Sequence, residues 1–238
     1  MYDQQQMAQA PPPPQQMLIA QCPPGLEPLL GLESVWIHQQ VDLVETFLPV
    51  ETKNKYQITD HRGAQCYMAF EQSNVFGRQF LGTGHPFHMD IIDNYGRMIF
   101  YCERPLQCCD DQVTVHLYDG TILGSVTHGW CACWNSEFNV FDQNRSHIFN
   151  IDGPCCGCAL TTCCMSEKYD VYPVHSKNPV AQIRKEFSGF LQEIATDADI
   201  FGVEFPIDLD AKMKAVLIGA VFLIDFTYYE TSGAQNNM

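Results

Sequence analysis

From residue 55 to residue 206 the chain alternates apolar and polar positions in short stretches, and turn-forming residues interrupt the alternation at close intervals. A period of two predicts strands with one buried face, and many such strands in close succession are typical of a barrel or a sandwich. The 94–96 and 119–120 segments contain the Asn, Asp and Gly that hairpin turns prefer. The predicted strands are 55–60, 65–70, 87–93, 97–103, 112–118, 121–127, 138–142, 147–151, 169–174, 180–185 and 203–206.

The N-terminal part of the chain does not follow this pattern. Residues 36–47 fit either a short helix or a strand followed by a turn. Residues 1–24 are rich in Gln, Pro and Ala, and the run 11–14 favours polyproline II. We expect a solvated tail at 1–24, with a docking peptide for the aromatic grooves of SH3 or WW domains as the alternative.

One segment is apolar on every side. The ten residues from Ala215 to Ile224 contain no polar side chain, so a helix here needs an apolar environment all round. Extended to 213–229, it would reach about 25 Å against about 30 Å of hydrocarbon. Asp225 would add on the order of 3 kcal/mol to insertion. A core helix enclosed by the strands is therefore favoured, and a membrane-inserted helix stays as the alternative.

The net charge of the chain limits the kinds of partner that can be expected. Among 238 residues, 13 are Lys or Arg and 28 are Asp or Glu, which gives a net charge of −15. A chain this acidic repels a phosphate backbone, and its densest basic stretch is only Arg184 and Lys185, with Lys177 nearby, so nucleic acid is not expected as a partner. Residues 1–16 lack the charged and apolar regions of a secretory signal, so we expect a chain that stays in the cytosol or the nucleus.

An acidic segment directly precedes the apolar one. Residues 197–210 contain five carboxylates, from Asp197, Asp199, Glu204, Asp208 and Asp210. Hard oxygen ligands at this density suit calcium, and Gly202 would permit a sharp turn between them. The match to an EF-hand loop is poor, since Phe201 and Pro206 interrupt it. A solvated acidic loop is an equal alternative, and a site of this kind would be weak, with a Kd on the order of 10⁻⁴ to 10⁻³ M.

The twelve cysteines suggest thiol chemistry rather than disulfides, because the cytosol is reducing. The pairs Cys131 with Cys133 and Cys155 with Cys158 have spacings that could supply four thiolates to zinc. Adjacent Cys108 and Cys109 are better suited to acylation. Cys155 and Cys158 are expected to be structural, and buried reduced thiols are the alternative to zinc binding there. The chain has no GxSxG, HExxH or phosphate-binding glycine motif, so hydrolase and nucleotide-dependent mechanisms have no support.

Several blocks together resemble one family. The stretch DADIFGVEFPIDLDAKMKAVLIGAVFLIDFTYYE, beginning at Asp197, is similar to the C-terminal signature of the phospholipid scramblases. Further blocks match in the same order: PPGLEPLLGL at 23–32, IHQQVDLVETF at 37–47, ETKNKYQI at 51–58, RPLQC at 104–108 and DGPC at 152–155. On these residues the chain is identified as a member of that family. The family's resemblance to Tubby C-terminal domains implies a mainly β fold, with a closed barrel of about twelve strands around a central apolar helix in 25–232, and tails at 1–24 and 233–238.

The resemblance also implies a function. It is the calcium-activated, ATP-independent movement of phospholipids in both directions between leaflets, at the cytosolic face of the plasma membrane or an endomembrane, without bond-making chemistry. A lipid-anchored, calcium-responsive signalling adaptor with no scrambling activity is the alternative, and homo-oligomers are a further expectation. The family's basic nuclear-import segment corresponds to 178–189, where only two basic residues are adjacent, so nuclear entry is not expected.

Site residues carry over from the family at matching positions. Its acylated cysteine run is reduced here to Cys108 and Cys109, and Ile200 stands where many relatives have a polar residue. Phe201 would contribute a backbone carbonyl. The calcium ligands implied by the resemblance are Asp197, Asp199, Phe201, Glu204 and Asp208.

Overall fold

Twelve strands and one long helix account for most of the described chain. The computed structural model describes residues 22–40, 54–72, 86–106, 110–129, 136–154, 167–186 and 199–229. A short 3-10 helix, η1 (Glu27–Leu29), precedes the strands, and helix α3 (Ala211–Tyr228) follows them. The strands are β1 (Ser34–Gln39), β2 (Lys55–Asp60), β3 (Gln65–Glu71), β4 (Phe87–Ile92), β5 (Met98–Arg104), β6 (Asp110–Leu117), β7 (Ile122–Gly129), β8 (Glu137–Asp142), β9 (His147–Asp152), β10 (Glu167–Pro173), β11 (Ala181–Glu186) and β12 (Ile200–Glu204).

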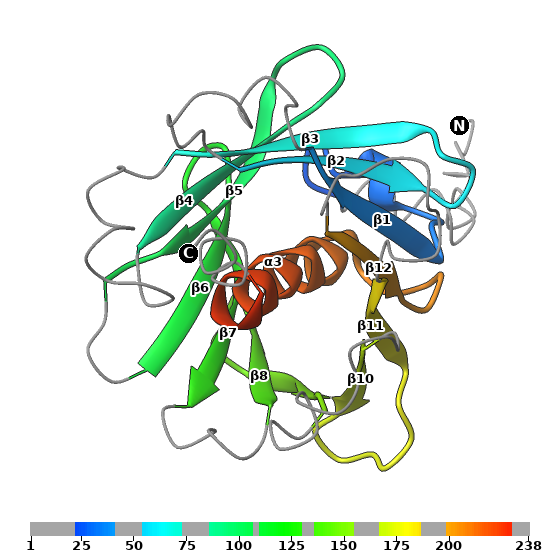
Figure 1. The fold of residues 1–238 in the computed structure, drawn as a ribbon, viewed down its shortest axis with the longest axis vertical. Coiled ribbons are helices and arrows are strands. Elements are labelled where there is room, and N and C mark those ends of the chain that lie inside the picture. Colours follow the sequence, from blue (N-terminus) through cyan, green and yellow to red (C-terminus); the bar gives the residue numbers. More distant parts are fainter. Residues whose placement is uncertain are drawn as a thin grey trace, which may run out of the picture.

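The strands form one closed barrel (Figure 1). Each strand pairs antiparallel with its neighbours in sequence, and β1 closes the ring by pairing with β12. Alternation in the sequence becomes alternation of burial: in β4 the side chains of Phe87, Met89 and Ile91 are buried and those between them are not. Closure leaves none of the twelve described strands at an unpaired sheet edge. The mainly β fold, a single closed barrel around a C-terminal helix, is confirmed.

Helix α3 runs through the interior of the barrel (Figure 1). All residues from Ala215 to Ile224 are buried, as is Asp225. A helix with no polar face finds an apolar surface on every side in this position, which is why the sequence can be uniformly apolar there. The core-helix interpretation is confirmed. Within the described part of the chain, no helix combines the length and hydropathy that a membrane span requires.

Two glycines let the helix lie close to β6 and β7. A Cβ atom on Gly219 of α3 would be 2.6 Å from Cγ2 of Val115 in β6. On Gly124 of β7 it would be 2.4 Å from the carbonyl oxygen of Phe141 and 2.8 Å from Cγ2 of Val216. All three distances are shorter than van der Waals contact, so larger side chains at these glycines would push the helix or the wall outward.

The two ends of the barrel differ. At the turn end, defined by the β2–β3, β4–β5, β6–β7, β8–β9 and β10–β11 connections and the start of α3, the hairpins are described throughout. Aspartates close several of them: Oδ1 of Asp60, Asp93 and Asp142 each accepts two backbone N–H groups of its own turn. Helix α3 ends at the opposite end, which we call the helix-exit end.

Two expectations for local structure need correction. The last predicted strand, 203–206, in fact covers Ile200–Glu204, so the acidic segment is not a single loop. Gly202 does not form a sharp turn; it lies inside β12, where an added Cβ would be 2.9 Å from the Trp36 ring, so the glycine makes room for that ring. In the ambiguous 36–47 segment, the described residues through Gln39 belong to strand β1, and 41–47 lie outside the described residues.

Candidate functional site

Strand β12 separates the residues expected to bind calcium. Asp199 precedes the strand at the helix-exit end, Glu204 is its last residue, and Asp208 follows in the turn leading to α3. A strand of five residues is about 16 Å long, whereas the ligands of one calcium ion all lie at roughly 2.3–2.6 Å from it. Among the described residues, no three His, Cys, Asp or Glu side chains are grouped so as to hold a metal. Asp197 lies outside those residues.

Two of these carboxylates already have cationic partners. Nζ of Lys185 is 2.8 Å from Oδ1 of Asp199, and the lysine side chain is only 4% exposed. Arg184 forms an ion pair with Glu204 on the outside of the barrel. Because β11 places Lys185 inside and Arg184 outside, the adjacent basic residues form no basic patch. Each is neutralised by a carboxylate of β12 or of the residue before it.

Phe201 is committed to the barrel wall. It pairs with Ile37 of β1 and with Lys185 of β11, and its side chain is buried. The arrangement of Asp199, Phe201, Glu204 and Asp208 therefore does not fit one calcium ion in the closed barrel. Calcium binding stays a prediction.

At the helix-exit end a polar cluster surrounds Tyr229. The Tyr229 hydroxyl bonds to the carboxylate of Glu167 and lies 2.8 Å from the hydroxyl of Tyr169. Nζ of Lys185 stands 3.5 Å from the centroid of the Tyr229 ring. Burial raises the pKa of Glu167, and the nearby lysine opposes that rise. These contacts join the end of the helix to β10, β11 and the residue before β12, so they fasten it to one side of the barrel.

A second cluster fastens the other side. Arg104 donates two hydrogen bonds of 2.5 Å to the carboxylate of Asp111, and Thr227 donates to the same carboxylate at 3.3 Å. The Tyr228 hydroxyl lies 3.0 Å from Nε2 of His128. Burial lowers the pKa of His128, against a smaller opposing effect of Asp111. The neutral imidazole is therefore the favoured form in the folded chain.

Lys214 anchors the start of the helix at the turn end. Its side chain is fully buried, and Nζ donates to the carbonyl oxygens of Leu29 at 3.2 Å, Leu32 at 2.8 Å and Ile207 at 3.0 Å. All three donors of the ammonium group have partners. Burial lowers the pKa of Lys214. Sequence reasoning missed this role because the pattern KMK gives no reason to bury one lysine and not the other, Lys212.

Asp225 is also satisfied inside the barrel. Its carboxylate accepts a hydrogen bond of 2.7 Å from the Tyr56 hydroxyl of β2. From the sequence, Asp225 was considered only as a residue that makes membrane insertion costly. In the structure it forms a buried polar contact between the helix and the barrel wall.

The expected cysteine sites cannot be compared with this geometry. All the cysteines of these expected sites lie outside the described residues, namely Cys108, Cys109, Cys131, Cys133, Cys155 and Cys158. Acylation and zinc binding stay predictions. Of the described cysteines, Cys102 is buried in β5, and burial raises the pKa of its thiol, so it is a packing residue.

Comparisons with known proteins agree with the residue blocks. Residues 13–231 match the family model described as Scramblase. Phospholipid scramblase 2 of Bos taurus is 38% identical over 221 residues, covering 90% of this chain and 74% of that protein. Phospholipid scramblase 1 of Homo sapiens is 38% identical, with 90% and 68% covered. Phospholipid scramblase family member 5 of Homo sapiens is 38% identical, with 88% and 79% covered.

One solved structure, an X-ray structure of a protein from Arabidopsis thaliana, is also similar. It is 15% identical, covers 82% of this chain and 93% of its own, and superposes with a TM-score of 0.44.

Proposed function

Since this chain belongs to the phospholipid scramblase family, we propose that it moves phospholipids between the two leaflets of a membrane. The observation that carries the proposal is the family match over residues 13–231, together with 38% identity to curated scramblases across 90% of the chain. Movement in both directions, without ATP and without bond-making chemistry, is part of the same proposal.

The barrel interior is unsuited to carry lipid. Helix α3 fills it, and the buried charged groups Lys214 and Asp225 are already bonded to the wall and to the N-terminal segment. A head group passing through would have to displace the helix and leave these groups without partners, at a cost of several kcal/mol each. We therefore propose that lipid crosses outside the barrel, where the bound protein perturbs the bilayer at its surface.

We include activation by calcium in the proposal, although the closed barrel gives it less support than it gives the rest. Asp199 and Glu204 are paired with Lys185 and Arg184, and Asp208 lies at the other end of the strand. A calcium site therefore requires either the opening of β12 or ligands from residues outside the described ranges, with Asp197 as the first candidate. Membrane attachment through acylation of Cys108 and Cys109, which connect β5 to β6, is a further part of the proposal.

The test is lipid exchange by the purified full chain in phosphatidylcholine vesicles that contain a fluorescent phospholipid. A membrane-impermeant reductant bleaches only outer-leaflet label in empty vesicles, and we expect it to bleach the inner-leaflet label as well when the protein is present, without ATP. Parallel reactions with calcium or with a chelator test activation. Bleaching that stops at the outer leaflet in both conditions, with the protein bound, contradicts the proposal.

That outcome would favour the second candidate, a lipid-anchored signalling adaptor. The observation in its favour is the filled interior, because a barrel with no internal lipid path still presents an outer surface to partners. The same vesicles decide between the two functions.

A further inference from the structure

Exposed apolar side chains gather on two neighbouring hairpins at the turn end. Tyr95 and Met98 belong to the β4–β5 hairpin and are 85% and 42% exposed. Tyr118 and Ile122 belong to the β6–β7 hairpin and are 56% and 43% exposed. The backbone N–H of Tyr118 donates to the carbonyl of Ile99 at 3.0 Å, which holds the two hairpins side by side. We call Tyr95, Met98, Tyr118 and Ile122 the hairpin edge.

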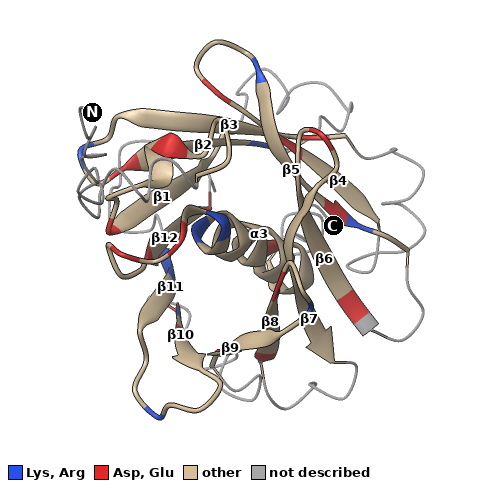
Figure 2. Cartoon of the chain, turned by 180° about the vertical axis from the view of Figure 1, so that it is seen from behind, with Lys and Arg blue, Asp and Glu red and all other residues tan. Residues whose placement is uncertain are grey.

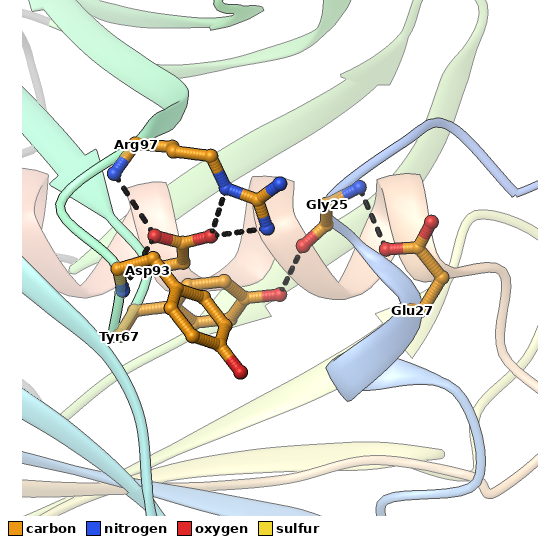
Figure 3. A network of polar contacts seen from close by, with 6 residues as sticks. Gly25, Glu27, Tyr67, Asp93 and Arg97 are labelled. Atoms are coloured by element: carbon orange, nitrogen blue, oxygen red, sulfur yellow. Dashed lines mark hydrogen bonds and ion pairs between the residues drawn. The ribbon is translucent and has the colours of Figure 1, made fainter.

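The hairpin edge is nearly uncharged in a strongly acidic protein. Arg97 is ion-paired with Asp93 at 2.7 Å and also donates to it through Nε and the backbone N–H (Figure 3). The guanidinium lies 5.4 Å from the centroid of the Tyr95 ring. Asp119 adds one carboxylate at the second tip, where it accepts the N–H of Thr121. The whole chain carries −15, so this is a surface that can approach a bilayer at small electrostatic cost.

We propose that the hairpin edge inserts into the head-group region of a zwitterionic phospholipid bilayer. The inference deepens the proposed function and rests on it. Tyrosine combines an apolar ring with a hydroxyl that stays hydrated, which suits the membrane interface, and an arginine stem can lie along the ring while its charge remains in water.

The shape of the edge favours a bilayer over a protein partner. The β4–β5 hairpin extends past the rest of the barrel wall (Figure 2). Asp93 and Arg97 flank the turn of this hairpin. A stable protein interface needs roughly 800 Å² of complementary surface from each partner. The protruding β4–β5 tip, with the β6–β7 turn beside it, offers a narrow contact that a soft head-group layer can surround.

The first test is flotation of the purified full chain, without acyl groups, with phosphatidylcholine vesicles. We expect Tyr95→Ser combined with Ile122→Ser to reduce the floated fraction at least fivefold. Val180→Ser combined with Ile207→Ser is the matched control, because these residues are 40% and 55% exposed at the same end of the barrel but belong to other connections. Equal flotation of both double variants, or no flotation of the parent chain, overturns the inference.

The second test measures how deeply the hairpin edge enters the bilayer. We expect fluorescence from Tyr95→Trp, after subtraction of the parent chain's own tryptophan signal, to be quenched by brominated acyl chains, and fluorescence from Val180→Trp to be unaffected. The quenching should be no stronger with phosphatidylserine vesicles in chelator, because the chain is acidic. No quenching at position 95, or an edge variant that changes only the oligomeric state in solution, overturns the inference in favour of a protein contact.

The two proposals fail separately. If the protein binds vesicles through the hairpin edge but exchanges no lipid, the proposed function is contradicted and the inference about the hairpin edge is not. If the protein exchanges lipid and the hairpin-edge substitutions do not change its binding to vesicles, only the further inference is contradicted.

Discussion

Lys214 shows how one buried charge joins three parts of the chain. Its ammonium group donates to the carbonyl oxygens of the last residue of η1, of a residue shortly before β1 and of a residue before α3, and no part of the side chain reaches solvent. A buried ammonium is costly, yet removing it leaves three buried acceptors unpaired, so the lysine is held in place by its surroundings.

We therefore expect Lys214→Met to lower the free energy of unfolding by about 2–4 kcal/mol, because the carbonyls of Leu29, Leu32 and Ile207 lose their donor. Urea unfolding followed by circular dichroism measures it. Lys212→Met is the control, two residues away and not fully buried, and should change the value by less than about 0.5 kcal/mol. Equal effects of the two substitutions would show that the three hydrogen bonds of Lys214 contribute nothing to stability.

The stability of the protein should depend on pH through His128. Burial holds its folded-state pKa below the ordinary 6.5, so between those two pKa values the unfolded chain binds a proton that the folded chain does not. The free energy of unfolding then falls as the pH is lowered through about 6.5 and recovers as it is raised. His38, whose pKa burial also lowers, acts with the same sign.

Thermal unfolding between about pH 7.5 and about pH 5.5 tests this. His128→Gln should show a smaller loss of Tm on acidification than the parent chain, with the remainder due to other groups such as His38. His61→Gln, in the exposed β2–β3 turn, should keep the parent pH dependence. If His128→Gln loses stability on acidification as steeply as the parent, the histidine is not responsible.

At the scale of elements, the contact of α3 with β7 depends on glycine. Gly124→Ala should lower the free energy of unfolding by roughly 1–3 kcal/mol, because the new methyl group would meet the carbonyl oxygen of Phe141 at 2.4 Å. Gly129→Ala lies on the same strand with nothing within 4 Å of the added atom and should be neutral within about 0.5 kcal/mol. Chemical denaturation compares the pair, and equal values would mean that the wall yields freely.

Strands could be predicted from the sequence where apolar and polar residues alternate, because the apolar side chains face the helix inside the barrel. β2 begins and ends where expected, and most other strands shift by one or two residues. β12 was misplaced because Asp197, Asp199 and Gly202 suggest a loop, whereas the barrel needs a twelfth strand to pair with β1. Its acidic residues were therefore predicted to converge. A sequence shows how far apart residues are along the chain, and only pairing shows that a strand holds Asp199 and Asp208 at opposite ends.

At the scale of the molecule, the two membrane contacts proposed for this chain are both adjacent to β5 and β6 in the sequence. The hairpin edge lies at the turn end of β5 and β6, and Cys108 and Cys109 fall between these two strands in the sequence. A chain that uses both contacts would lie with β5 and β6 along the bilayer surface. Tyr101 and His116, whose rings stack at 4.8 Å across these strands, would then face lipid head groups.

The barrel and its helix should be one cooperative unit. Eight large apolar side chains of α3 are buried, namely Val216, Leu217, Ile218, Val221, Phe222, Leu223, Ile224 and Phe226. At about 1.5–3 kcal/mol each, their burial contributes on the order of 12–24 kcal/mol, which is as large as the whole stability of a typical domain. A chain ending at Asp210 should therefore lose its cooperative thermal transition and its near-ultraviolet circular dichroism. A chain ending at Tyr229 keeps every helix contact described above and should melt like the parent. If the chain ending at Asp210 instead melted cooperatively near the parent Tm, α3 would be a separable segment that is free to leave the barrel for a membrane.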